Sequence, residues 1–311
     1  MKLIEQIKEL KEKTFTSSLQ NVNIDSIMIY DKNEIQTHFY KEDSLHEMRS
    51  ISKVLIALAY GIAIDKKMKI FNDELSVNTF VYPIIKDLVK IKKENTDKIK
   101  KWTVKTLLTY SAGYENQMFS ERFIKDINEK DYLSYVLNYE LQNQPNKKYV
   151  YNNAELFILS VFFQEAFKIN IKDFICDEIF KPLNITKFVW KDYYKYCPGG
   201  TGLYISHNDL FKIGQLVLQK GTYEQKQIVS SEYIEAMCSC QIETPYAVKP
   251  ERVLPKQAVG YIMHISRDGY VYKDGTNGQY LIVNFNKQQL ITILSSEPEM
   301  SKVTEILRNL I

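Results

Sequence analysis

Apolar and polar residues alternate with different periods in different parts of this 311-residue sequence. The apolar positions of residues 3–10 recur at helical spacing, which predicts an amphipathic helix. Residues 26–40 contain two β-rich runs on either side of the polar residues 31–34, and this pattern predicts a hairpin. The next segment, residues 50–64, is apolar on nearly every face, so we expect a helix that is buried all round.

Helical patterns dominate the middle of the chain, from about residue 73 to residue 190. Within it, the lysine-rich residues 86–101 alternate charged and apolar positions, which is typical of a solvated helix face rather than a binding tail. A further helix is predicted over residues 206–218, with Ser206 at its N-cap and Asp209 three residues later.

After Pro255 the apolar period changes to two, which predicts three or four strands joined by tight turns and then a closing helix over residues 300–311. Because strands stand at both ends of the chain, one antiparallel sheet built from both ends is the simplest arrangement. We expect an α/β fold of the α+β type. Its sheet domain would comprise residues 1–72 and 191–311, and an inserted, mainly helical domain residues 73–190, with the active-site cleft between the two.

Composition and charge limit the classes of protein to consider. Hydrophobic residues make up 45% of the chain and charged residues 25%, which is typical of a globular protein with a substantial core. The 41 Lys and Arg against 38 Asp and Glu leave a net charge of +3, too small an excess to indicate a nucleic-acid partner. No run approaches the ~20 consecutive apolar residues of a membrane span. Since the residues after Met1 do not form a secretory signal, we expect a cytoplasmic protein.

The cysteines and histidines show no pattern that is typical of a metal site or a catalytic triad. Cys238 and Cys240 could form half of a metal site, but no second Cys or His pair lies nearby, so free thiols are expected. The four histidines fall into no such pattern either, and we expect His46 to have a structural role. No metal or organic cofactor is expected.

Candidate chemistry begins at Ser50, at the start of the buried helix. Ser50 and Lys53 are three residues apart and would share a helix face. The helix N-terminus would stabilise a serine alkoxide, and apolar surroundings would lower the pKa of the lysine so that its neutral amine acts as a base. The alternative is an ordinary N-cap serine beside a lysine whose amine reaches solvent.

Two further segments carry groups that suit a cleft. Tyr151 and Asn153 precede a helix expected over residues 154–167, where the phenol could relay protons and the amide could orient a carbonyl. The alternative is a strand edge with an asparagine cap. The glycines of residues 272–279 would let a strand approach a ligand closely and donate an N–H to an oxyanion together with the N–H of Ser50. The alternative there is a bulged hairpin.

Taken in order, these groups resemble the motifs of the serine β-lactamase and penicillin-binding protein superfamily, whose first motif is S-x-x-K. The Tyr-x-Asn element of this superfamily is matched by Tyr151 and Asn153, and the Lys/His-x-Gly element by Lys273 and Gly275.

The likeness extends beyond these motifs, to the branch that contains class C β-lactamases, D-aminopeptidases and family VIII esterases. Residues 107–114 (LLTYSAGY), 180–185 (FKPLNI) and 199–221 are similar to three further segments of that branch. The resemblance therefore covers most of the chain, from about Met48 to Leu294.

The resemblance implies an antiparallel sheet flanked by helices, a helical domain on one side, and hydrolysis of a small ester or amide through an acyl-enzyme intermediate. The resemblance implies that Ser50 is the nucleophile and that Lys53 and Tyr151 transfer protons. It also implies that Asn153 contacts the substrate carbonyl or amide, and that Lys273, beside Gly275, borders the pocket electrostatically. The backbone N–H of Thr276 would be an oxyanion donor.

Asp274 departs from the family pattern, which usually has a small Thr, Ser or Gly at this position. A carboxylate beside Lys273 would offset its charge and repel the carboxylate of a β-lactam or a peptide. We therefore expect weak turnover of β-lactams and a preference for esters or amides that lack this carboxylate. A β-lactamase or a D-stereospecific peptidase is the alternative among enzymes, and a non-catalytic penicillin-recognising protein is the alternative among binding proteins.

Overall fold

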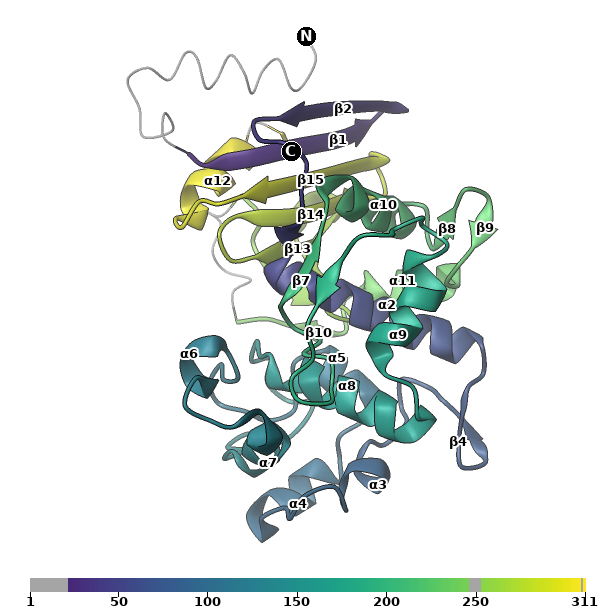
Figure 1. The fold of residues 1–311 in the computed structure, drawn as a ribbon, viewed down its shortest axis with the longest axis vertical. Coiled ribbons are helices and arrows are strands. Elements are labelled where there is room, and N and C mark those ends of the chain that lie inside the picture. Colours follow the sequence, from purple (N-terminus) through teal and green to yellow (C-terminus); the bar gives the residue numbers. More distant parts are fainter. Residues whose placement is uncertain (1–21, 246–252, 309) are drawn as a thin grey trace.

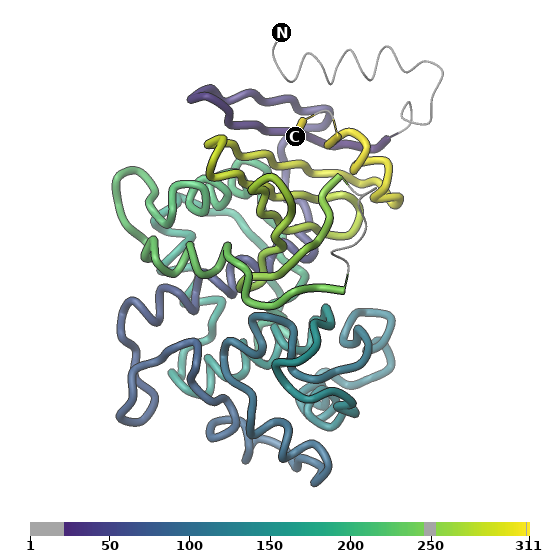
Figure 2. The backbone as a smooth tube through the Cα atoms, turned by 180° about the vertical axis from the view of Figure 1, so that it is seen from behind, coloured from purple at the N-terminus to yellow at the C-terminus, as the bar shows by residue number. Residues whose placement is uncertain are grey.

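An eight-stranded antiparallel sheet dominates the computed structural model, which describes residues 22–245, 253–308 and 310–311 (Figure 1). Its strands, in the order in which they lie side by side, are β10 (Ile242–Glu243), β11 (Ala258–Val259), β12 (His264–Ile265), β13 (Tyr270–Gly275), β14 (Gln279–Asn284), β15 (Gln289–Ser295), β1 (Ile24–Asp31) and β2 (Glu34–Phe39). The pairing of β1 with β15 confirms a sheet built from both ends of the chain, and Figure 2 shows these purple and yellow segments side by side from behind. The helix expected over residues 3–10 lies outside the described residues.

The N-terminal hairpin is confirmed. Asp31 pairs with Glu34, and Lys32 and Asn33 between them have positive φ angles of 49° and 66°. A two-residue turn with both φ angles positive matches the right-handed twist of the strands that it joins.

After Pro255 the sheet contains five strands, whereas the sequence predicts three or four. The apolar run over residues 258–268 is divided into β11 and β12. The chain reverses between them, where Ile262 has a φ of 70° and a Cβ on Gly260 would lie 2.0 Å from the carbonyl oxygen of Met237. Met237 ends α11 (Ser231–Met237), so the break depends on a contact between distant segments.

Helices cover both faces of the sheet. On one face, α12 (Met300–Leu307) buries Val303 and Leu307 against β-strand residues such as Ile282. On the other face, α10 (His207–Leu218) packs against β14 and β15. The predicted N-cap of α10 is confirmed, because the Ser206 hydroxyl accepts a hydrogen bond from the Asp209 N–H.

The middle of the chain is mainly helical, as predicted, and lies below the sheet in Figure 1. Its helices and the buried helix before them are α2 (Lys53–Asp65), α3 (Tyr82–Ile85), α4 (Lys93–Ile99), α5 (Val104–Leu108), α6 (Glu121–Ile124), α7 (Tyr132–Asn138), α8 (Ala154–Phe167) and α9 (Ile171–Ile175), with short helical turns η1 (Arg49–Ser52), η2 (Glu129–Asp131) and η3 (Cys176–Phe180). A further short turn, η4 (Arg267–Gly269), lies between β12 and β13. One hydrophobic cluster contains α2, α8 and sheet residues such as Leu290. The division into domains at residues 73 and 190 therefore stays a prediction.

Short strands complete the fold and fix the chain next to Ser50. They are β3 (His46–Glu47), β7 (Leu203–Ile205) and β6 (Val189–Trp190), which form a three-stranded sheet, and the pairs β4 (Lys69–Ile70) with β5 (Asp73–Glu74) and β8 (Thr222–Tyr223) with β9 (Lys226–Gln227). The Met48 N–H donates to the Leu203 carbonyl at 2.8 Å, just before η1 begins. Among the described residues, no helix is long and apolar enough to cross a membrane.

Candidate active site

Ser50 lies on η1, the short turn that leads into the buried helix α2. The residue before it, Arg49, has a φ of 48°, which is uncommon for a bulky side chain. An ion pair between Arg49 Nε and Glu47 Oε2, 3.0 Å apart, holds this residue in place. Ile51 and Ser52, which follow Ser50 on the same turn, are buried, whereas Ser50 keeps partial exposure. The turn therefore presents the Ser50 hydroxyl to solvent.

Lys53 is fully buried at the first position of α2. Its Nζ lies 2.9 Å from Ser50 Oγ and 2.5 Å from the carbonyl oxygen of Gly200. Burial, reinforced by the positive charge of Lys273, holds the pKa of the Lys53 amine well below its ordinary value. The alternative of a solvent-reaching lysine is wrong, because the Lys53 side chain has no exposure. The N-cap alternative is wrong too, since no side-chain cap bond forms at η1 or α2.

Tyr151 approaches Ser50 from the loop before α8. Its hydroxyl donates to Ser50 Oγ at 2.6 Å, although the two residues are 101 positions apart in the sequence. Burial raises the pKa of the phenol, and the hydrogen bond to Ser50 only partly offsets this effect. Tyr151 therefore stays protonated and serves as a hydrogen-bond donor at neutral pH. The expected helix after this loop is confirmed, because α8 spans Ala154–Phe167.

Three lysine amines surround the Tyr151 ring. The Nζ atoms of Lys273, Lys53 and Lys256 lie 4.7, 5.2 and 5.6 Å from the ring centroid. Those amines that carry a proton interact favourably with the aromatic face at these distances. Lys256, which lines the cleft in front of the ring, is one group that the sequence did not single out.

His264 is the second group that the sequence missed. Its Nε2 lies 2.9 Å from Lys273 Nζ and 3.2 Å from Asp274 Oδ1. Burial, with the charges of Lys256 and Lys273, holds the pKa of His264 well below its ordinary value, so the ring is neutral. The pairing of β12 with β13 places His264 opposite Tyr272, next to Lys273. The sequence assigned no role to His264, and the structure places it beside Lys273 and Asp274.

Asp274 turns toward the same group of side chains. Its Oδ1 lies 3.7 Å from Lys273 Nζ, and its side chain is 28% exposed at the edge of the cleft. Burial opposes ionisation of Asp274, but Lys256, His264 and Lys273 outweigh it and keep the pKa of the carboxyl well below its usual range. Burial lowers the pKa of Lys273 to about 7, an effect that Asp274 opposes and Lys256 strengthens.

Asn153 and the end of β13 complete the site. Asn153 stands at the N-cap position of α8, but its side chain makes no cap bond, whereas Asn152 Oδ1 accepts from the Ala154 N–H at 3.1 Å. Asn153 Oδ1 is buried and has no hydrogen-bond partner among the described residues. A Cβ on Gly200 would lie only 3.2 Å from this oxygen and 3.4 Å from Lys53 Nζ, so glycine leaves room for both groups.

Gly275 lets β13 pack directly against the turn that carries Ser50. A Cβ at this position would lie 3.0 Å from Arg49 Cβ and 3.1 Å from the Met48 carbonyl oxygen. The close approach is thus to protein backbone, whereas the sequence suggested an approach to a ligand. The hairpin alternative is also present, because Gly275 pairs with Gln279 across a loop in which Asn277 and Gly278 have positive φ angles.

A cleft of about 600 Å³ lies over these groups. Of the site residues predicted from the sequence, those that line it are Ser50, Tyr151, Asn153, Asp274, Gly275 and Thr276. Lys53 and Lys273 lie beneath its surface with no exposure of their own. No cluster of three or more His, Cys, Asp or Glu side chains that could hold a metal occurs in the part of the chain that the structure describes, and this includes the surroundings of Cys238 and Cys240.

The sequence model of the beta-lactamase family matches residues 25–308. The chain belongs to this family. Members of the beta-lactamase fold are generally hydrolases, and this assignment agrees with the predicted antiparallel sheet and helical insertion. A search of curated protein sequences gave no significant match.

Solved structures support the fold of this beta-lactamase-family chain. The hydrolase EstCE1, with promiscuous acyltransferase activity, has a TM-score of 0.78 and 11% identity, covering 99% of this chain and 98% of its own. An octameric penicillin-binding protein homologue from Pyrococcus abyssi has a TM-score of 0.76 and 17% identity, covering 99% and 77%. A Bacillus anthracis protein described as a 6-aminohexanoate-dimer hydrolase has a TM-score of 0.73 and 18% identity, covering 97% and 79%. Identities this low show a shared fold alone.

The lowered pKa of Lys273 leads to a prediction for stability. Between about pH 7 and pH 10.4 the unfolded lysine binds a proton that the folded one has lost, so stability rises with pH in this window. Lys273→Met is expected to reduce the rise in unfolding free energy between pH 7.5 and 9.5 by about 2 kcal/mol. Urea denaturation at both pH values measures this change, with the exposed Lys86→Met as control. An unchanged rise in Lys273→Met would contradict the lowered pKa.

Proposed function

We propose that this protein is a serine hydrolase that cleaves an uncharged ester or amide through an acyl-enzyme intermediate. The observation that carries the proposal is the position of Ser50 Oγ, 2.9 Å from the buried Lys53 amine and 2.6 Å from the Tyr151 hydroxyl. Both distances are within the range that direct proton transfer requires.

Acylation begins when the neutral Lys53 amine takes the proton of Ser50, directly or through the Tyr151 hydroxyl. The Ser50 oxygen then forms a bond to the substrate carbonyl carbon, and the carbonyl electron pair moves onto its oxygen. When the tetrahedral intermediate collapses, the bond to the leaving group breaks. The leaving oxygen or nitrogen takes the proton back from the Lys53–Tyr151 pair. A water molecule activated by the same pair then releases the acyl group from Ser50.

Backbone N–H groups would stabilise the oxyanion. The N–H groups of Ser50 and Thr276 are the proposed donors, and the close packing that Gly275 permits supports their placement on either side of one point. Asn153 would orient the substrate carbonyl or amide, since its buried Oδ1 has no partner among the described residues and would become satisfied by a substrate N–H.

Labelling with a fluorophosphonate tests the nucleophile. We expect a covalent mass adduct on the wild type and none on Ser50→Ala, because Ser50 is the hydroxyl whose proton has an acceptor next to it. Lys53→Met is expected to slow labelling by about 10²- to 10⁴-fold, the usual contribution of a general base. Intact-protein mass spectrometry measures both effects.

Ser52→Ala is the matched control, because Ser52 lies on the same turn but donates its hydroxyl proton to the Arg49 carbonyl. Full labelling of Ser50→Ala would contradict Ser50 as the nucleophile of the proposed hydrolase. A second contradicting outcome is no labelling of the wild type. The second outcome would favour the alternative of a binding protein without turnover.

The charge of Asp274 supports the choice of an uncharged substrate. Its carboxylate compensates the positive charge of Lys256, which lines the cleft, and that of Lys273 beneath it, so the cleft offers little net positive charge to an anionic substrate. Both amides and esters are included in the proposal, because one structural neighbour is described as a 6-aminohexanoate-dimer hydrolase, which cleaves an amide bond, and another as a hydrolase with promiscuous acyltransferase activity. These descriptions bear on the bond that is cleaved and not on the charge of the substrate.

Replacement of Asp274 tests this selectivity. In Asp274→Thr, the uncompensated charge of Lys256 attracts a substrate carboxylate, so the ratio of kcat/KM for nitrocefin to that for p-nitrophenyl acetate is expected to rise at least about tenfold. Steady-state kinetics measure the ratio, with the exposed Asp87→Thr as control. A wild-type nitrocefin rate comparable to the best ester rate, or an unchanged ratio in Asp274→Thr, would refute the selectivity.

A further inference from the structure

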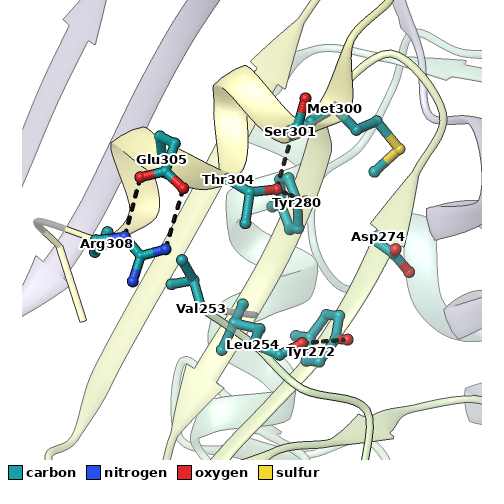
Figure 3. Close-up of a pocket in the computed structure, with 10 residues that line it drawn as sticks. All are labelled: Val253, Leu254, Tyr272, Asp274, Tyr280, Met300, Ser301, Thr304, Glu305 and Arg308. Carbon is teal, nitrogen blue, oxygen red and sulfur yellow. Dashed lines mark hydrogen bonds and ion pairs between the residues drawn. The ribbon is translucent and has the colours of Figure 1, made fainter. Parts of the chain in front are cut away.

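A second cavity of about 400 Å³ adjoins the catalytic cleft on the side of α12 (Figure 3). Its walls come from α12, from the faces of β13 and β14 that α12 covers, and from Val253 and Leu254. Asp274 and Met300 line both cavities, so the two spaces meet at these side chains. We call this second space the side chamber.

The tyrosine and threonine hydroxyls of the side chamber already have partners within its own walls. The Tyr272 hydroxyl donates to the Leu254 carbonyl at 3.1 Å, and the Tyr280 hydroxyl lies 3.0 Å from Thr304 Oγ1 (Figure 3). The Thr304 hydroxyl in turn donates to the Met300 carbonyl at 2.8 Å. Apart from the exposed Ser301 hydroxyl and the charged groups, a ligand would therefore meet the ring faces of the tyrosines and the hydrocarbon of the aliphatic residues.

Charges in the side chamber are arranged against an anionic occupant. Arg308 is engaged by both carboxylate oxygens of Glu305, at 3.0 and 3.1 Å. The remaining ionised group is Asp274, at the junction with the cleft. An anion would have to pass this carboxylate without gaining a new cationic partner, so an uncharged group is favoured.

From these observations we propose that the side chamber binds an uncharged, apolar arm of the substrate, either its acyl chain or the chain of its leaving alcohol or amine. The inference rests on the proposed function, since it takes the reacting carbonyl to lie at Ser50. At the ~30 Å³ that a small group occupies in a liquid, the chamber volume corresponds to about ten non-hydrogen atoms. Substrates with a medium-length chain on one side of the scissile bond therefore fit the two spaces together.

Two series of esters distinguish the two sources of the arm. The first compares p-nitrophenyl acetate with p-nitrophenyl hexanoate, and the second compares ethyl acetate with hexyl acetate. Full burial of one methylene group is expected to increase kcat/KM about fourfold, and burial in a half-open chamber about twofold for each methylene. We expect the wild type to prefer the longer substrate of one series by about tenfold or more, and the series that shows it identifies the arm.

Ser301→Trp places a large side chain in the chamber from an exposed position of α12, so the core is left intact. This variant is expected to reduce the preference for the longer ester to less than about threefold. Lys302→Trp is the matched control on the same helix, and it should keep the wild-type preference because Lys302 is not part of the chamber wall. No preference in either series, or an equal preference in Ser301→Trp and the wild type, would overturn the proposal.

A binding experiment separates failure of the chamber from failure of the proposed function. Calorimetry on Ser50→Ala compares ethyl hexanoate and hexyl acetate with ethyl acetate, without any need for turnover. Tighter binding of a longer ester that is lost in the Ser50→Ala, Ser301→Trp double variant supports the chamber even if no ester is hydrolysed. Equal binding of all three esters refutes the chamber, whatever the activity at Ser50.

Discussion

A lysine amine that folding removes from water is the constraint on which the rest of the site depends. Lys53 stands on a helix that is apolar on nearly every face, and it has no exposure to solvent. Because an ammonium ion in such surroundings is costly, the neutral amine is favoured. Ser50, one helical turn earlier, is the group that this amine reaches. The same burial that packs the core therefore favours the neutral amine that the proposed mechanism needs as a base.

In the proposed function, the choice of substrate depends on the same charged side chains that act on the pKa of Lys53. Lys273 contributes to the lowered pKa of Lys53, and Asp274 acts in the opposite direction. The same carboxylate compensates Lys256 at the cleft and stands at the entrance to the side chamber. One acidic side chain thus influences the pKa of Lys53 and, in the proposed function, the charge of the substrate.

Local features of the chain were predicted well from the sequence. The hairpin around Lys32, the buried helix after Ser50 and the cap at Ser206 depend on neighbouring residues, whose periods and turn preferences are visible in the sequence. The approach of Tyr151 to Ser50 was inferred from a family resemblance, because no local pattern relates positions 101 residues apart.

Features that depend on tertiary contacts were missed. His264 reaches Lys273 only through the pairing of β12 with β13, and the break between these short strands depends on α11. Lys256 is one of many lysines in the sequence, and nothing in its neighbours indicates that it faces Tyr151.

The most direct test of the buried base is an NMR titration of ε-¹³C-labelled lysine, with the Lys53 signal assigned by its loss in Lys53→Met. A midpoint well below the ordinary value of about 10.4 is expected, whereas a midpoint near that value would contradict a neutral amine beside Ser50.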